Sequence, residues 1–124
     1  MNEVLLYTGS AIIIIWGVAH LIPTKAIVRG FGAVSEDNKK IITMESIAEG
    51  LTLCFIGILV LMVTIVGGYE DKVSKAVFWA SGIMLFIIAI LTALTGARTS
   101  ILPYKICPLV KTVVALLFIL GILI

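Results

Sequence analysis

Two glutamates lie one helical turn apart in the stretch "ITMESIAEGLTL", Ile42 to Leu53, where a long apolar run begins. Glu45 and Glu49 therefore share one helix face, which continues through Thr52. An ionised carboxylate at the centre of a membrane helix costs about 2.5–3.5 kcal/mol on insertion scales, and less near the interface. Such a residue usually faces the interior of a bundle and has a partner there. The pair predicts a polar site in an apolar region.

Two interpretations of the glutamates remain open. The helix predicted at residues 41–66 extends about 39 Å, roughly 9 Å more than the hydrocarbon thickness, so Glu45 is expected at the headgroups near the positive end of the helix dipole. Glu49 lies about 6 Å deeper along the helix. It either forms a structural ion pair or contacts a ligand, a proton or a metal ion.

Candidate partners occur near the same depth in the other apolar runs. His20 ends the first run on a face shared with Trp16, Arg98 ends the third run, and Lys111 begins the fourth. Taken singly, His20 fits a hydrogen-bonded interfacial residue, and Arg98 and Lys111 fit side chains that snorkel to the headgroups. Their convergence at one end of the helices nevertheless predicts a polar pocket. The expected pocket residues are Glu49, Glu45, His20, Arg98, Lys111, Trp16 and Thr52.

Sequence motifs for established chemistry are missing from the chain. A histidine with two carboxylates makes a metal site conceivable, but no HxxxH or ExxH spacing supports one, and we assign none. Cys54 and Cys107 form no CxxC motif and are interpreted as buried, unreactive thiols without a disulfide. The chain also lacks a nucleophile–base motif, a haem-ligand pair and a cluster-binding cysteine set. We therefore assign no catalytic residue and no cofactor.

The elements that position these residues follow from composition. Of 124 residues, 61% are apolar and 13% charged, which is far from a soluble composition. A membrane-spanning helix needs about 20 mostly apolar residues, and backbone amides in lipid must bond within their own segment. The predicted fold is all-α, a polytopic membrane protein folded as one antiparallel four-transmembrane-helix bundle. Its helices are expected at about residues 4–22, 41–66, 75–96 and 106–124.

Charged residues predict the orientation of this bundle. Seven lysines and arginines lie in or beside the first and third connections, including Lys111 at the start of the fourth helix, and only Lys72 and Lys75 lie in or beside the second connection. The positive-inside rule therefore places the first and third connections in the cytoplasm and both termini outside it, in the cell (inner) membrane. No basic residue precedes the first run, so it is expected to be a span and not a cleaved signal. Basic and aromatic residues do not interleave, so we expect no nucleic-acid partner.

The connections and the third run predict further contacts. In "PTKAIVRGFGAV", Ile27, Phe31 and Val34 recur at helical spacing, which is typical of an amphipathic interfacial segment at about residues 24–34. In "SEDNKK", Ser35 or Asp37 is the expected N-cap of the second long helix. A small-xxx-small stripe in the third run allows close helix packing, either inside the bundle or between copies of the chain; its residues are Ala89, Ala93 and Ala97.

The stretch "GVAHLIPTKAIVRGFGAVSEDNKKIITMESIAEGLTLCFIGILV" resembles small four-helix membrane proteins of the DoxX-like group. The shared features are a first helix ending in Gly and His, an "FG" in the first connection, and a polar, Gly-containing entry to the second helix. An arginine expected near the start of the first helix in that group is absent, since only Glu3 is charged there. The resemblance covers about the first half of the chain. It implies an antiparallel four-helix bundle and association with membrane redox or quinone chemistry, and it carries over no catalytic residue.

Three classes of function remain open. The first is a bundle that binds or transports a small cation, a proton or an amphipathic ligand at a polar pocket near the cytoplasm. The second is the redox- or quinone-associated subunit that the DoxX-like resemblance implies. The third is a membrane scaffold in which the charges only fix helix depth and register. The first class is favoured because the ionisable residues converge at one end of the helices, and the missing motifs make an enzyme less favoured.

Overall fold

The computed structural model describes residues 2–124, and every regular element in this range is helical. The elements in chain order are α1 (Asn2–Leu21), α2 (Thr24–Gly30), α3 (Glu36–Gly67), α4 (Lys72–Leu94), the 3-10 turn η1 (Gly96–Arg98) and α5 (Leu102–Leu123). Within the described residues, four helical segments are long and apolar enough to cross a membrane. The expectation of an all-helical chain with four long apolar helices is confirmed.

All four long helices begin earlier than predicted, α1 by two residues and the other three by three to five. The Ser35 hydroxyl accepts a hydrogen bond from Asn38 N at 3.1 Å, so α3 begins at Glu36 with Ser35 as its N-cap. Asp71 accepts bonds from the first-turn amides of Val73 and Ser74, which starts α4 at Lys72. The last helix, α5, begins at Leu102, and Pro108 therefore lies inside it and not in its first turn.

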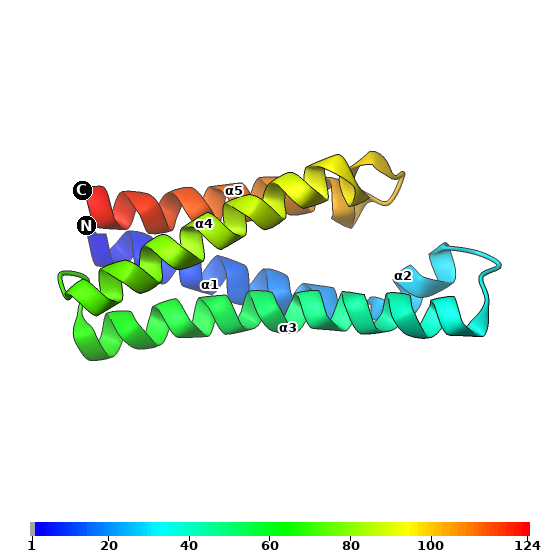
Figure 1. The fold of residues 1–124 in the computed structure, drawn as a ribbon, viewed down its shortest axis with the longest axis horizontal. Coiled ribbons are helices and arrows are strands. Elements are labelled where there is room, and N and C mark those ends of the chain that lie inside the picture. The colour runs from blue at the N-terminus through cyan, green and yellow to red at the C-terminus, as the bar shows by residue number, and fades with distance from the viewer. Residues whose placement is uncertain (1) are drawn as a thin grey trace.

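The long helices are arranged so that α1 lies against α3 and α5, and α4 lies against α5 (Figure 1). The start of α1 and the end of α5 lie at one end of the bundle, beside the turn that joins α3 to α4. We call this the terminal end. From that turn, α3 and α4 diverge toward the opposite end, which carries α2 and η1 and which we call the α2 end (Figure 1).

A close crossing of α1 and α3 positions residues that matter below. A Cβ atom added at Gly17 would lie 2.8 Å from Gly50 O, and one added at Gly50 would lie 2.9 Å from Gly17 O. Only glycine at both positions allows the two backbones to approach this closely. His20 follows Gly17 by one helical turn, and Glu49 immediately precedes Gly50, so the crossing brings these two side chains together.

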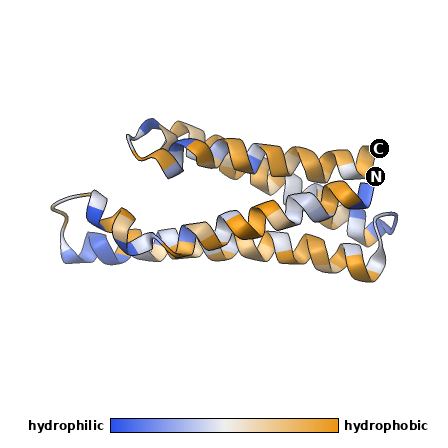
Figure 2. Cartoon of the chain, turned by 180° about the vertical axis from the view of Figure 1, so that it is seen from behind, coloured by the Kyte–Doolittle hydropathy of each residue, from blue (hydrophilic) through white to orange (hydrophobic). Residues whose placement is uncertain are grey.

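Side chains from all four long helices fill the core, including Ile13, Leu53, Leu85, Val114 and Phe118. The outer surface of the long helices is mostly apolar, and hydrophilic residues gather at the two ends (Figure 2). This distribution fits a multi-pass membrane protein, because a soluble bundle would expose a polar outer face.

The segment predicted to lie in the membrane interface is shorter than expected. Its helix, α2, ends at Gly30, and Gly32 takes a positive φ of 77°, which breaks the helical spacing before Val34. Phe31 is exposed at the end of α2, while Val28 is buried. The apolar face predicted through Ile27, Phe31 and Val34 is therefore not continuous.

Candidate functional site

A fully buried lysine lies near the centre of the site. Lys111, on α5, has an exposed fraction of 0%. Its ammonium donates a hydrogen bond to Glu49 Oε1 on α3 and another to Thr92 Oγ1 on α4, the latter at 2.9 Å. A buried charge is tolerated only when it is paired and hydrogen-bonded. Lys111 therefore joins three helices through two polar partners.

The second oxygen of Glu49 points toward α1. Glu49 Oε2 lies 3.8 Å from His20 Nε2, and the other ring nitrogen, His20 Nδ1, lies 3.0 Å from the carbonyl oxygen of Trp16. A neutral imidazole must carry its proton on Nδ1 to donate to that carbonyl, which leaves a lone pair on Nε2. The unprotonated nitrogen of His20 then faces the interior of the bundle.

Cys107 completes this cluster from α5. Its Sγ lies 3.6 Å from His20 Nε2 and accepts a hydrogen bond of 3.3 Å from the indole Nε1–H of Trp16. The side chains of Trp16, Cys107, His20, Glu49, Lys111 and Thr92 thus form one continuous polar chain across all four long helices. We call this set the buried polar chain.

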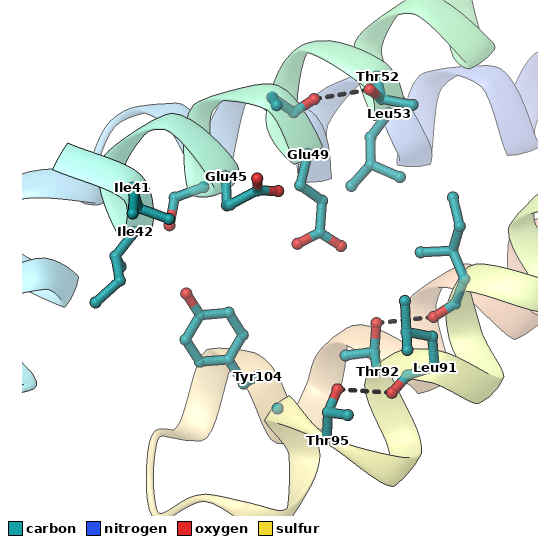
Figure 3. Close-up of a pocket in the computed structure, with 14 residues that line it drawn as sticks. Ile41, Ile42, Glu45, Glu49, Thr52, Leu53, Leu91, Thr92, Thr95 and Tyr104 are labelled. Carbon is teal, nitrogen blue, oxygen red and sulfur yellow. Dashed lines mark hydrogen bonds between the residues drawn. The ribbon is translucent and has the colours of Figure 1, made fainter. Parts of the chain in front are cut away.

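A cavity of about 500 Å³ lies beside the buried polar chain, between the diverging parts of α3 and α4. Glu49 extends from α3 into this space, and the Tyr104 hydroxyl points toward α3 from the opposite side (Figure 3). The Glu49 side chain is 27% exposed, so it contacts both the buried lysine and the cavity. The lining is mostly apolar, and its polar members are Glu45, Ser46, Glu49, Thr52, Thr92, Thr95 and Tyr104.

A second, smaller cavity of about 270 Å³ lies between the end of α1, α2 and the start of α5. Its lining is almost entirely apolar and includes Trp16, His20, Ile27 and Tyr104. Tyr104 lines both cavities. The His20–Glu49 contact therefore lies between two spaces at the α2 end of the bundle, with one residue of the contact in the wall of each.

Most of the residues predicted for the polar site come together in the structure. Glu49, His20, Lys111 and Trp16 belong to the buried polar chain, and Glu45 and Thr52 line the larger cavity. The structure shows this geometry, and their role in binding a ligand stays a prediction.

The structure separates the two basic residues that the sequence placed near Glu49. Arg98 is exposed in η1 and takes no part in the buried polar chain. Lys111 does not snorkel toward a surface, because its side chain is enclosed by the bundle and its ammonium is used by Glu49 and Thr92. One basic residue, not two, is therefore available to neutralise Glu49.

Five further polar residues of the site were not predicted: Cys107, Thr92 and Tyr104, together with Ser46 and Thr95 of the cavity lining. Cys107 precedes Lys111 by four residues, so both lie on one face of α5, and this spacing is a usable signal. Thr92 also donates its hydroxyl to the carbonyl of Ile88 in its own helix, an ordinary role that conceals its contact with Lys111. Tyr104 follows Pro103 in a region predicted as a connection, and its place on a helix was not expected.

The stripe of small residues is only partly used within one chain. Ala89 is 4% exposed and packs in the bundle, whereas Ala93 is exposed and Ala97 is half-buried. The divergence of α4 from α3 leaves the end of the stripe uncovered. A contact between copies of the chain through Ala93 therefore stays a prediction.

Comparisons with protein-family models, with curated proteins and with solved structures found no match to this chain. The resemblance to DoxX-like proteins accordingly stays an expectation from the sequence.

Proposed function

We propose that the chain is a multi-pass protein of the cell (inner) membrane in which the four long helices form an antiparallel transmembrane bundle. The apolar outer surface of these helices supports insertion in a bilayer (Figure 2). The α2 end faces the cytoplasm, because seven of the nine lysines and arginines belong to the first and third connections and the helix residues beside them. Both termini lie on the other side.

In this bundle, the cavity between α3 and α4 binds a small amphipathic molecule with a cationic head group. The carboxylate of Glu49 is neutralised from behind by Lys111, while Glu45 makes no salt bridge within residues 2–124. The cavity wall therefore carries about one uncompensated negative charge. A cationic group at Glu45 would supply the missing partner.

The apolar lining decides between a bare ion and an amphipathic molecule. Ile41, Ile88 and Leu91 line the cavity together with the polar residues, and its volume lies in the range of about 300–1,000 Å³ typical of sites for organic ligands. A hydrated cation or a proton has no apolar surface to bury against these residues. The observation that carries the proposal is the unpaired Glu45 at the mouth of a mostly apolar cavity.

The test uses a dansyl-labelled long-chain primary amine and its neutral N-acetyl analogue as probes, with the full chain in a nonionic detergent. We expect the amine to bind with enhanced fluorescence and Glu45→Gln to weaken its binding about tenfold, which is about 1.4 kcal/mol. Ala48→Trp fills the cavity wall and is expected to abolish binding, whereas Ala93→Trp, on an exposed part of α4, is not.

The same titration separates the three classes of function. Tight binding of the neutral analogue alone would contradict the cationic ligand and favour the quinone-type chemistry that the DoxX-like resemblance implies. Binding of neither probe would favour a scaffold. Equal binding of both probes, unchanged by Glu45→Gln, would show that Glu45 does not select the ligand.

The orientation has a separate test in intact cells. In a chain with Cys54→Ser and Cys107→Ser, a membrane-impermeant maleimide should label Glu70→Cys from outside and Ser100→Cys only after lysis. The reverse pattern would overturn the orientation and leave the helix count unchanged.

A further inference from the structure

Three metal-ligating side chains meet within the buried polar chain. His20 of α1, Glu49 of α3 and Cys107 of α5 each offer one donor atom, and these atoms all lie within 4.8 Å of one another. They come from three different helices, so no spacing along the sequence predicts that they form one cluster. His20 and Cys107 do not line the cavity between α3 and α4.

The distances within this cluster fit a small tetrahedral ion. Zinc bonds of about 2.3 Å to sulfur and about 2.0–2.1 Å to nitrogen or oxygen place S and N about 3.5 Å apart and N and O about 3.4 Å apart. Cys107 Sγ and His20 Nε2 are 3.6 Å apart, and His20 Nε2 and Glu49 Oε2 are 3.8 Å apart. The third distance, between Cys107 Sγ and the Glu49 carboxylate, is within 4.8 Å, and it would contract toward about 3.5 Å around a common ion.

Each of the three donors is also oriented by a neighbour. His20 Nδ1 lies 3.0 Å from Trp16 O, which turns the lone pair of Nε2 toward the cluster. The Trp16 indole N–H donates to Cys107 Sγ at 3.3 Å, a bond that stabilises negative charge on sulfur. Lys111 is bonded to Glu49 Oε1 and leaves Oε2 free. Partners of this kind orient the ligands in protein metal sites.

We infer that His20, Cys107 and Glu49 form a binding site for a thiophilic transition-metal ion of the zinc class. Binding replaces the thiol proton of Cys107 with the metal ion and releases that proton to solvent. A thiolate and an imidazole select such ions over Mg²⁺ and Ca²⁺, which prefer oxygen ligands. Three protein ligands leave one tetrahedral position for water or another small ligand.

The first experiment titrates Co²⁺ into the full chain in a nonionic detergent. We expect one Co²⁺ per chain, a thiolate-to-cobalt charge-transfer band in the near ultraviolet, and loss of the band when Zn²⁺ is added. Mg²⁺ and Ca²⁺ should leave the band unchanged. Absence of a charge-transfer band would overturn the inference.

Matched cysteine variants locate the ion. Cys107→Ser should abolish the charge-transfer band, whereas Cys54→Ser should retain it, because Cys54 contacts the carbonyl of Ile14 away from the cluster. Trp16→Phe removes the N–H bond to Cys107 Sγ and should weaken Co²⁺ binding about 10-fold or more. A band that survives Cys107→Ser, or that disappears in Cys54→Ser, would contradict the site.

A measurement on the unmodified chain covers the case in which Cys107→Ser does not fold. X-ray absorption of the zinc-loaded protein should show one sulfur at about 2.3 Å together with nitrogen and oxygen ligands. A shell without sulfur would overturn the inference. Binding of the metal ion is expected to be independent of the amphipathic ligand. Ala48→Trp should block binding of the amine and leave Co²⁺ binding intact. Cys107→Ser should abolish Co²⁺ binding and leave binding of the amine intact.

Discussion

On the side of α3 that faces α1, a Cβ atom at Gly50 would lie 2.9 Å from the backbone oxygen of Gly17, so the two backbones approach closely at this crossing. On the side that faces α4, the helices diverge (Figure 1) and leave an open cavity of about 500 Å³ between them (Figure 3). Glu49 lies between the two sides: its Oε2 faces His20 of α1, its Oε1 bonds Lys111 of α5, and its side chain also lines the cavity. Close packing on one side thus holds a carboxylate firmly while the other side leaves it accessible.

The comparison teaches how an apolar bundle retains a charged group. The tight side supplies His20 at a fixed position, and the neighbouring helix α5 supplies Cys107 and a buried cation, Lys111. The open side, the cavity between α3 and α4, holds no comparable set of closely placed polar groups within residues 2–124. The proposed organic ligand and the inferred metal ion would therefore lie on opposite sides of α3, the ligand near Glu45 in the open cavity and the ion at Glu49 on the tight side.

The largest effect is expected from removing the partner of Lys111. Glu49→Ala leaves a fully buried ammonium with only Thr92 and should lower the free energy of unfolding by about 3–5 kcal/mol. Glu45→Ala, one turn away on the same helix, should change it by no more than about 0.5 kcal/mol. Chemical unfolding of both variants in one detergent measures the difference.

A double variant sharpens this prediction. Replacing both charges, as in Glu49→Leu with Lys111→Met, should restore most of the lost stability because no unpaired charge remains in the bundle. If the double variant is no more stable than Glu49→Ala, the loss comes from packing and not from the charge.

A smaller effect is expected at the helix crossing. Gly50→Ala places a Cβ atom against the α1 backbone and should cost about 1–3 kcal/mol, because backbone gives way less readily than a side chain. Gly30→Ala is the control, since nothing lies within 4 Å of a Cβ atom there. Equal melting temperatures of the two variants would show that α1 and α3 are not held as closely as described.

The smallest effects concern the stripe on α4. Ala89→Leu adds volume at a buried position and should cost about 1–2 kcal/mol, whereas Ala93→Leu is expected to be neutral within about 0.5 kcal/mol. Size-exclusion chromatography of both variants tests a contact between copies. A change of oligomeric state with Ala93→Leu alone would show that the exposed end of the stripe is an interface.

Much of the fold could be predicted because membrane-length apolar runs leave few alternatives. A run of about 20 apolar residues has to satisfy its backbone internally, so helix type and number follow from composition. The starts of the helices were less accurate. Ser35 was one of the two N-caps expected for the second long helix and is the N-cap of α3, but hydropathy placed the first helical residue at about 41 and not at Glu36. Asp71 begins α4 within a polar stretch that hydropathy assigns to a connection.

For the site, the sequence by itself determined which ionisable residues need a partner, because of their free-energy cost in an apolar environment. Glu49, His20 and Lys111 are ionisable groups in apolar runs, and the energetic cost of such groups in lipid identifies them without any structure. Spacing along one helix also placed Glu45 and Thr52 on the face of Glu49. These inferences need only local geometry and solvation.

Only the tertiary structure decided which of these residues are partners. The choice of Lys111 over Arg98, and the meeting of Cys107 with His20 and Glu49, depend on how α1, α3 and α5 are rotated and offset against one another. Periodicity fixes which residues share a face, but it leaves open the face of another helix that they meet. The Gly17–Gly50 crossing sets the offset between α1 and α3, because close backbone contact fixes their relative position. The position of α4 is not fixed in this way, because a cavity separates it from this part of α3.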